Sequence, residues 1–196
     1  VIAEKSIGFD GVLNYYAGRN EVADPDFEKA FVEHTKWNPL WAKPYVVDAD
    51  PSLVAQIGRD DMVRGNTISA VGFYGPQGRY VRLPLANPGL NASIEAFDYK
   101  GRRVTNYEME SAPLQGLGKL MGHRCMTVCS IIANRFTNDA NPNYKGGISD
   151  LITTVLGVYV GIYIALPLAD RFYKALTRKQ HAREAASVTA GASTRT

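Results

Sequence analysis

The sequence predicts an α/β fold in which a mostly parallel sheet is flanked by helices. Short runs rich in β-branched and aromatic residues alternate with segments whose apolar residues recur at helical spacing. The chain has 196 residues, of which 45% are hydrophobic and 21% are charged. This composition supports one packed core and excludes a chain that is disordered throughout.

Local signals mark the first elements. Residues 1–16 alternate loosely between apolar and polar side chains around Gly8 and Gly11, which predicts a strand, a turn and a second strand. Asp24-Pro25 is typical of a helix start, because aspartate caps free N–H groups and proline fits the first helical position. Apolar residues at helical spacing then predict a helix over 25–37.

Similar signals continue to residue 133. Asp50-Pro51 repeats the helix start, and Pro113 is compatible with a helix because it falls in the first turn. The nearly continuous apolar run at 125–133 is typical of a strand buried on both faces. We therefore predict strands at 45–47, 62–74, 104–109 and 125–133, and helices at 51–57, 88–98 and 111–121.

The positive charge is concentrated near the end of the chain. Six of the 22 basic residues and two of the 19 acidic residues lie within 151–196, so this part carries +4 and residues 1–150 carry −1. A body that is close to neutral does not indicate a nucleic-acid-binding surface. We therefore expect no nucleic acid among the partners.

A hydrophobic segment precedes the basic tail. Leu151–Ala169 contains 19 residues and no charge, and as a helix it would be roughly 28 Å long, close to the thickness of a bilayer core. The basic and aromatic flank that follows fits the positive-inside side of a membrane span. Thr153, Thr154 and Pro167 weaken this interpretation, and a buried core helix is the alternative.

These features divide the chain into three parts. Residues 1–148 form the body, 149–170 a candidate transmembrane helix, and 171–196 a basic, partly disordered tail. We expect a lipid bilayer as a partner, with the tail on the positive-inside side. If the hydrophobic helix belongs to the core instead, we expect a cytoplasmic protein.

Cysteine and histidine give no sign of disulfide or metal chemistry. On one face of a strand, Cys125 and Cys129 would lie about 13 Å apart, which is too far for a disulfide. His123 lies near Cys125, but further ligands at zinc spacing are lacking. A histidine in a helix-to-strand turn is the simpler interpretation, and we expect no metal.

Polar residues follow two of the predicted strands. One segment is Gly72–Tyr80 and the other is Asn106–Ser111. Ligands of open α/β sheets bind at the carboxyl ends of the strands, so both segments are candidates for a site. Taken without further context, Glu108 and Glu110 fit ordinary surface carboxylates better than site residues.

These segments resemble motifs of the nucleoside phosphorylase family, and within it of the uridine phosphorylases. Phe73–Arg79 resembles the loop that reads uracil, Tyr107–Ser111 resembles the ribose-binding motif, and Ile131–Arg135 resembles the strand that follows it. The resemblance covers about residues 1–151. It implies a partial nucleoside-phosphorylase-like mixed sheet flanked by helices, plus a hydrophobic C-terminal helix where family members have an amphipathic one.

The resemblance implies a role for each motif residue. The amide of Gln77 suits the imide edge of uracil, and the guanidinium of Arg79 would stabilise the anion that develops on the base. Glu110 would accept hydrogen bonds from ribose hydroxyls. The implied catalytic residues are Arg79 and Gln77, and the implied substrate-binding residues are Phe73, Gln77, Arg79, Glu108, Met109, Glu110, Ile131 and Ile132.

The implied reaction is the reversible phosphorolysis of a pyrimidine nucleoside to the base and ribose 1-phosphate. It requires no metal or organic cofactor. Purine members of the family use an acidic residue near the base, where this sequence has Asn134-Arg135, with Asp139 shortly after as the remaining acidic candidate. The family's dimers and rings of dimers also imply an oligomer.

Departures from the family pattern leave a second hypothesis open. We find no Gly-rich loop that leads into a helix and could hold phosphate, and Arg19 matches no phosphate motif, so the phosphate-binding residues are unknown. The chain begins with Val1, which indicates a processed, truncated or incompletely recorded sequence. The alternative to an enzyme that binds nucleoside and phosphate is an inactive, phosphorylase-derived accessory subunit of a membrane protein complex, anchored by its C-terminal helix.

Overall fold

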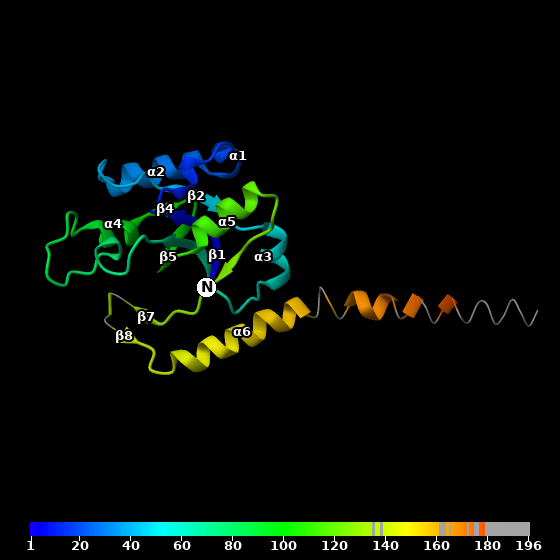
Figure 1. Ribbon diagram of the computed structural model, residues 1–196. Helices are drawn as coiled ribbons and strands as arrows, with labels where there is room; N and C mark the ends of the chain where they lie inside the picture. The colour runs from blue at the N-terminus through cyan, green and yellow to red at the C-terminus, as the bar shows by residue number, and fades with distance from the viewer. Residues whose placement is uncertain are drawn as a thin grey trace, which may run out of the picture. The chain divides into compact units, whose positions relative to one another are not determined.

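In the computed structural model of the chain, three parallel strands form the centre of the sheet (Figure 1). They lie in the order β1 (Ile2–Gly8), β3 (Arg64–Ser69) and β5 (Arg102–Glu108). The edges are antiparallel, because β2 (Tyr45–Asp48) and β6 (Thr127–Val128) pair with β1, and β4 (Asp98–Tyr99) pairs with β5. The sheet is therefore mixed, with a parallel centre.

The structure describes residues 1–134, 136–137, 139–160, 164, 166–171, 173–174 and 177–178. The chain divides into two compact units, Val1–Tyr144 and Lys145–Thr196. The sheet and the helices that cover it belong to the first unit.

Four of the predicted helices are present in this unit. They are α2 (Pro25–Thr35), α3 (Pro51–Ile57), α4 (Leu90–Ala96) and α5 (Ser111–Leu120). Both Asp-Pro signals act as expected: the Asp24 carboxylate accepts a hydrogen bond from the Phe27 N–H at 3.0 Å, and Asp50 accepts from the N–H groups of Ser52 and Leu53. Shorter helices occur at η1 (Val12–Tyr15), α1 (Arg19–Val22) and η2 (Gly75–Gln77).

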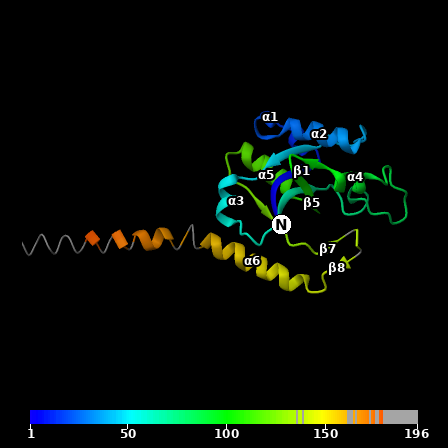
Figure 2. The same ribbon diagram turned by 180° about the vertical axis from the view of Figure 1, so that it is seen from behind.

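The helices cover both faces of the sheet. On β2, Val46 belongs to one buried cluster while Tyr45 and Val47 belong to another, because successive side chains of a strand point to opposite faces. Helices α2 and α4 supply the cluster around Val46, and α5 contributes to the cluster around Tyr45. The view from behind in Figure 2 shows the same strands between these helices.

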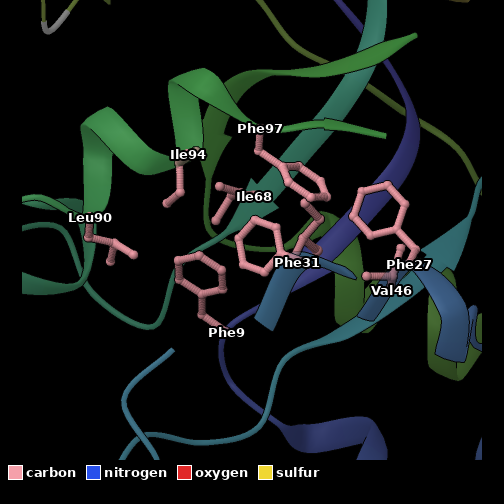
Figure 3. Close-up of a cluster of buried hydrophobic side chains, with 9 residues drawn as sticks. Phe9, Phe27, Phe31, Val46, Ile68, Leu90, Ile94 and Phe97 are labelled. Carbon is pink, nitrogen blue, oxygen red and sulfur yellow. The ribbon is translucent and has the colours of Figure 1, made fainter. Parts of the chain in front are cut away.

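The larger cluster is dominated by aromatic rings. Figure 3 shows Phe27 and Phe31 facing Phe97, with Ile68 of the central strand between the helices. The Phe31 and Phe97 rings meet edge to face, with centroids 5.2 Å apart. This geometry is favoured by the ring quadrupoles, and it fixes α2 against α4.

A glycine allows β1 and β2 to pack closely. Gly8 lies opposite Tyr45 in the antiparallel ladder, and a Cβ atom at Gly8 would lie 2.3 Å from Tyr45 Cζ. The buried tyrosine ring therefore occupies the space that any side chain at position 8 would need.

Three sequence predictions are corrected here. The second strand within 1–16 is wrong, since this stretch forms η1 after Gly11 turns the chain at φ +67°. The strand at 62–74 is shorter, because β3 covers Arg64–Ser69. The doubly buried strand at 125–133 is wrong as well: β6 spans only Thr127–Val128, Cys129 and Ser130 are half-buried, and residues 131–134 are exposed.

The segment after β6 forms a small separate sheet. β7 (Ala133–Asn134) pairs with β8 (Asp139–Ala140) in antiparallel fashion. Cys125 and Cys129 are both free thiols.

The second unit contains the predicted hydrophobic helix only in part. α6 spans Tyr144–Val160, and residues 161–163 and 165 of the predicted 149–170 helix lie outside the described residues. Among the described residues, no helix is both long enough and apolar enough to cross a membrane. The transmembrane prediction is therefore not supported. Most of the predicted tail, 179–196, also lies outside the described residues.

Candidate active site

The loop that follows β3 is built by short-range backbone hydrogen bonds. The Tyr74 carbonyl accepts from the N–H groups of Gln77 at 3.0 Å and Arg79 at 2.9 Å, and the Gly78 N–H donates to the Gly75 carbonyl. Pro76 lies in this turn, η2, where its missing N–H is not needed. The sequence therefore folds locally into a tight loop that fixes the positions of Gln77 and Arg79.

The predicted base-reading residues come together in this loop. The Gln77 side chain is buried, with 3% of its surface exposed, and its Oε1 accepts a hydrogen bond from Arg79 Nη1 at 3.0 Å. The same guanidinium donates to the Phe73 carbonyl and lies over the Phe73 ring, with Cζ 3.5 Å from the ring centroid. These contacts orient the amide of Gln77, since its oxygen must face the guanidinium.

Two side-chain hydrogen bonds connect the loop after β3 to the strand β5. Asn91 of α4 donates from Nδ2 to the Gln77 carbonyl at 3.2 Å, and the hydroxyl of Tyr107 on β5 donates to Asn91 Oδ1 at 2.8 Å. Asn91 was not among the predicted site residues, because its spacing in the sequence carries no signal for a contact with residue 77. It connects the loop after β3 to β5.

Gly78 is required for this arrangement. It has φ +71°, and a Cβ atom there would lie 2.3 Å from Asn91 Nδ2. We expect Gly78→Ala to lower the free energy of unfolding by more than about 2 kcal/mol, because positive φ costs an alanine about 1–2 kcal/mol before any clash is added. Urea denaturation followed by circular dichroism measures this.

Gly101 provides the matched control for this substitution. It has φ +80°, but no atom lies within 4 Å of the position of a Cβ. Gly101→Ala therefore carries the strain of positive φ without the clash, and it should be less destabilising than Gly78→Ala. Equal losses in the free energy of unfolding of the two variants would show that the Asn91 side chain moves aside without an energetic penalty.

The second polar segment lies at the carboxyl end of the adjacent strand. Ser69, the last residue of β3, is in register with Glu108, the last residue of β5. The two predicted motifs therefore begin at neighbouring strand ends, as the sequence pattern implied.

The Glu108 carboxylate is engaged within the fold. It accepts hydrogen bonds from the hydroxyls of Ser69 and Ser111, and from the N–H groups of Glu110 and Ser111 at 2.7 Å each. The Ser69 hydroxyl also accepts from the Ala112 N–H at 2.7 Å. Glu108 thus joins β3, β5 and the start of α5, where its negative charge is also stabilised by the helix dipole. Glu110 and Met109 are exposed at the same junction.

A third strand end lies near this junction. Asp10, just after β1, accepts from the Tyr45 hydroxyl at 3.3 Å and from the Val12 N–H at 2.7 Å. Burial, followed by the neighbouring Asp10 and Glu108 carboxylates, raises the pKa of Tyr45 far above its usual range. Tyr45 is therefore protonated at physiological pH, which lets its hydroxyl donate to Asp10.

A pocket of about 720 Å³ opens beside the loop that follows β3. Its wall combines Phe9 at the end of β1, aromatic residues between α2 and β2, and the loop after β3. Arg79 is one of the few charged residues in this mostly apolar wall. The residues most useful to a planar ligand here are Phe9, Trp37, Trp41, Tyr74 and Arg79.

Several predicted substrate-binding residues lie away from this pocket. Its wall includes Arg79 but not Phe73, Gln77, Glu108, Met109 or Glu110. Arg79 makes no ion pair with Glu110 within the described residues. Ile131 and Ile132 are 44% and 45% exposed and also do not line it. The structure brings together Phe73, Gln77 and Arg79, while the convergence of this set with the ribose motif remains a prediction.

The remaining candidates for acid–base or metal chemistry are peripheral. Asp139 is exposed on β8 and does not line the pocket, and Arg135 lies outside the described residues. Arg19, which matches no phosphate motif, forms an ion pair with Glu28. In the part of the chain that the structure describes, no group of histidine, cysteine and acidic side chains is arranged to hold a metal ion.

Comparison with known proteins identifies the fold. No family model matches the sequence. A crystal structure of Trypanosoma brucei nucleoside phosphorylase, described as showing uridine phosphorylase activity, matches 82% of this chain with a TM-score of 0.70 and 22% sequence identity. The chain has a nucleoside phosphorylase fold.

A sequence match points in the same direction. The chain is 41% identical over 81 residues, or 38% of its length, to a uridine phosphorylase of Thermococcus kodakarensis. It spans 26% of that relative and 57% of the Trypanosoma brucei nucleoside phosphorylase chain. The resemblance seen in the motifs thus extends to a partial sequence similarity and to the nucleoside phosphorylase fold.

Proposed function

We propose that the protein to which this chain belongs is a uridine phosphorylase. The observation that carries the proposal is the Phe73, Gln77 and Arg79 cluster at the end of β3, with a buried amide held by a guanidinium. The uridine phosphorylase that is 41% identical to part of the chain supports the same assignment. Within the described residues, no observation favours the membrane accessory subunit.

The base would be recognised by amide complementarity. Uracil presents an N–H donor between two carbonyl acceptors, and the carboxamide of Gln77 offers both a donor and an acceptor. The contact with Arg79 sets which way this amide faces. The exposed Phe73 and Tyr74 rings provide apolar surface for the base.

The chemical step would depend on charge stabilisation. A phosphate oxygen bonds to C1′ of uridine while the C1′–N1 bond breaks. The electron pair of the C1′–N1 bond moves to the uracil ring. The proton that hydrogen phosphate loses on forming the ester balances the proton that N1 of the uracil anion takes up from solvent, so the products are uracil and ribose 1-phosphate. Arg79 would stabilise the uracil anion, and Glu110 would hold the ribose hydroxyls. We assign no residues to phosphate.

Replacing Gln77 tests the assignment. We expect Gln77→Ala to weaken uridine binding by about 1–3 kcal/mol, because the base would lose its amide partner in a buried site. Isothermal titration calorimetry measures the affinity. Gln56→Ala, on the exposed surface of α3, is the matched control and should bind like the wild type.

A direct assay tests the activity itself. The chain is incubated with uridine and phosphate, and uracil release is followed by chromatography. Phosphate-dependent uracil release that falls in Gln77→Ala supports the proposal. Absence of uracil release together with absence of uridine binding would refute it.

A further inference from the structure

A second cleft lies at the opposite ends of the parallel strands, where β1 and β3 begin. It has a volume of about 550 Å³ and is lined by the first residues of β1 and β3, the end of β2, and helices α3 and α5. Glu4 and Arg64 belong to the starts of their parallel strands, whereas the base-reading loop follows a strand end. Figure 1 shows α3 and α5 beside β1. We call this the α3–α5 cleft.

Gln115 provides a buried acceptor in this cleft. Only 1% of its surface is exposed, and its Oε1 has no hydrogen-bond partner. Its Nε2 faces the Ala3 carbonyl at 3.5 Å, which sets the amide orientation, because the reversed amide would place two oxygens together. An unpartnered buried carbonyl is costly, so this atom indicates a ligand that donates a proton.

The charges around Gln115 differ on its two sides. Asp48 and Asp50 lie at the end of β2 and the start of α3. Asp48 pairs with Lys5, with 2.6 Å between Oδ1 and Nζ, whereas Asp50 forms no ion pair among the described residues and is the acidic group left for a ligand. Lys119 lies one helical turn after Gln115 on α5, so both side chains share one helix face. Within the described residues, Lys119 makes no ion pair. A cation at the acidic side and an anion at Lys119 would both be accommodated.

We propose that the α3–α5 cleft binds a small zwitterion of the amino acid class. Its ammonium group donates to Gln115 Oε1 on the side of the cleft that holds Asp50, and its carboxylate accepts from Lys119. The ammonium satisfies the one buried acceptor that the fold leaves open at this cleft. This binding does not depend on uridine or on the base-reading loop.

Binding of simple probes to the full chain tests the class of ligand. Glycine and γ-aminobutyrate carry both charges, ethylamine carries only the ammonium, and acetate carries only the carboxylate. Titration is followed by NMR of the Gln115 side-chain amide. We expect at least one zwitterion to bind about tenfold more tightly than ethylamine or acetate, as expected for one additional charged hydrogen bond. Acetate binding as tightly as the zwitterions, or no probe binding at millimolar concentration, would overturn the proposal.

Two variants test the residues. Gln115→Leu should weaken binding of the zwitterion about tenfold or more. Gln56→Leu, an equivalent change on the exposed face of α3, should leave the affinity unchanged. If Gln115→Leu does not fold, Lys119→Ala provides the test, because the exposed end of α5 tolerates substitution and the same loss of affinity is expected. Unchanged affinity in Lys119→Ala would exclude the proposed carboxylate contact.

Discussion

Arg19→Ala is expected to lower the free energy of unfolding by about 3–5 kcal/mol, the usual loss when one partner of a buried ion pair is removed. Its partner Glu28 is 2% exposed, and the second Glu28 oxygen accepts from the Val46 N–H at 3.1 Å. Without the guanidinium, the carboxylate would remain buried beside a single backbone donor. Urea denaturation measures the loss.

An exposed ion pair serves as the control. Arg59 and Asp61 are 3.0 Å apart, and more than half of each side chain is exposed. Arg59→Ala should change stability by less than about 1 kcal/mol, because water replaces the lost contact. The double variant Arg19→Ala with Glu28→Gln should recover part of the loss, since a neutral amide is easier to bury. An Arg19→Ala chain as stable as Arg59→Ala would contradict the assigned role of the pair.

The two glutamates of the ribose motif should behave differently when replaced. Glu108→Ala removes the acceptor of four hydrogen bonds at the junction of β3, β5 and α5. We expect a loss of about 3 kcal/mol in stability, because buried donors would be left without partners. The midpoint of urea unfolding measures this change.

Glu110→Ala is the matched variant two residues away. Its side chain is exposed, so stability should stay within about 0.5 kcal/mol of the wild type. If Glu110 binds the ribose hydroxyls, uridine affinity should instead fall by about 1–3 kcal/mol. Equal unfolding midpoints for the Glu108 and Glu110 variants would show that the four hydrogen bonds do not hold this junction together.

The helix starts and the main strands followed from local information. Asp24-Pro25 and Asp50-Pro51 predict helix starts because capping acts within three residues along the chain. The base-reading loop is also local, since Phe73, Gln77 and Arg79 are held by contacts within seven residues. The resemblance of this segment to a uracil-reading loop grouped the three residues, and contacts between near neighbours are enough to bring them together.

The run at 125–133 shows where local information fails. Its apolar composition suggested burial on both faces, but burial requires neighbouring segments on each face. The structure pairs this run with β1 over Thr127–Val128 and with β8 at Ala133, and Ile131 and Ile132 lie between the two pairings. Ile131 and Ile132 are therefore left exposed.

The sequence by itself determined the α/β alternation, the capped helices and the side chains gathered in the loop after β3, because these depend on periodicity and on contacts between near neighbours. The tertiary structure decided that Glu108 joins the strands and that Arg19 pairs with Glu28. It also decided that Asn91 contacts Gln77 and that Gln115 lines a cleft. Those assignments join residues that are far apart in the chain, and only packing of the whole unit brings them within hydrogen-bond distance.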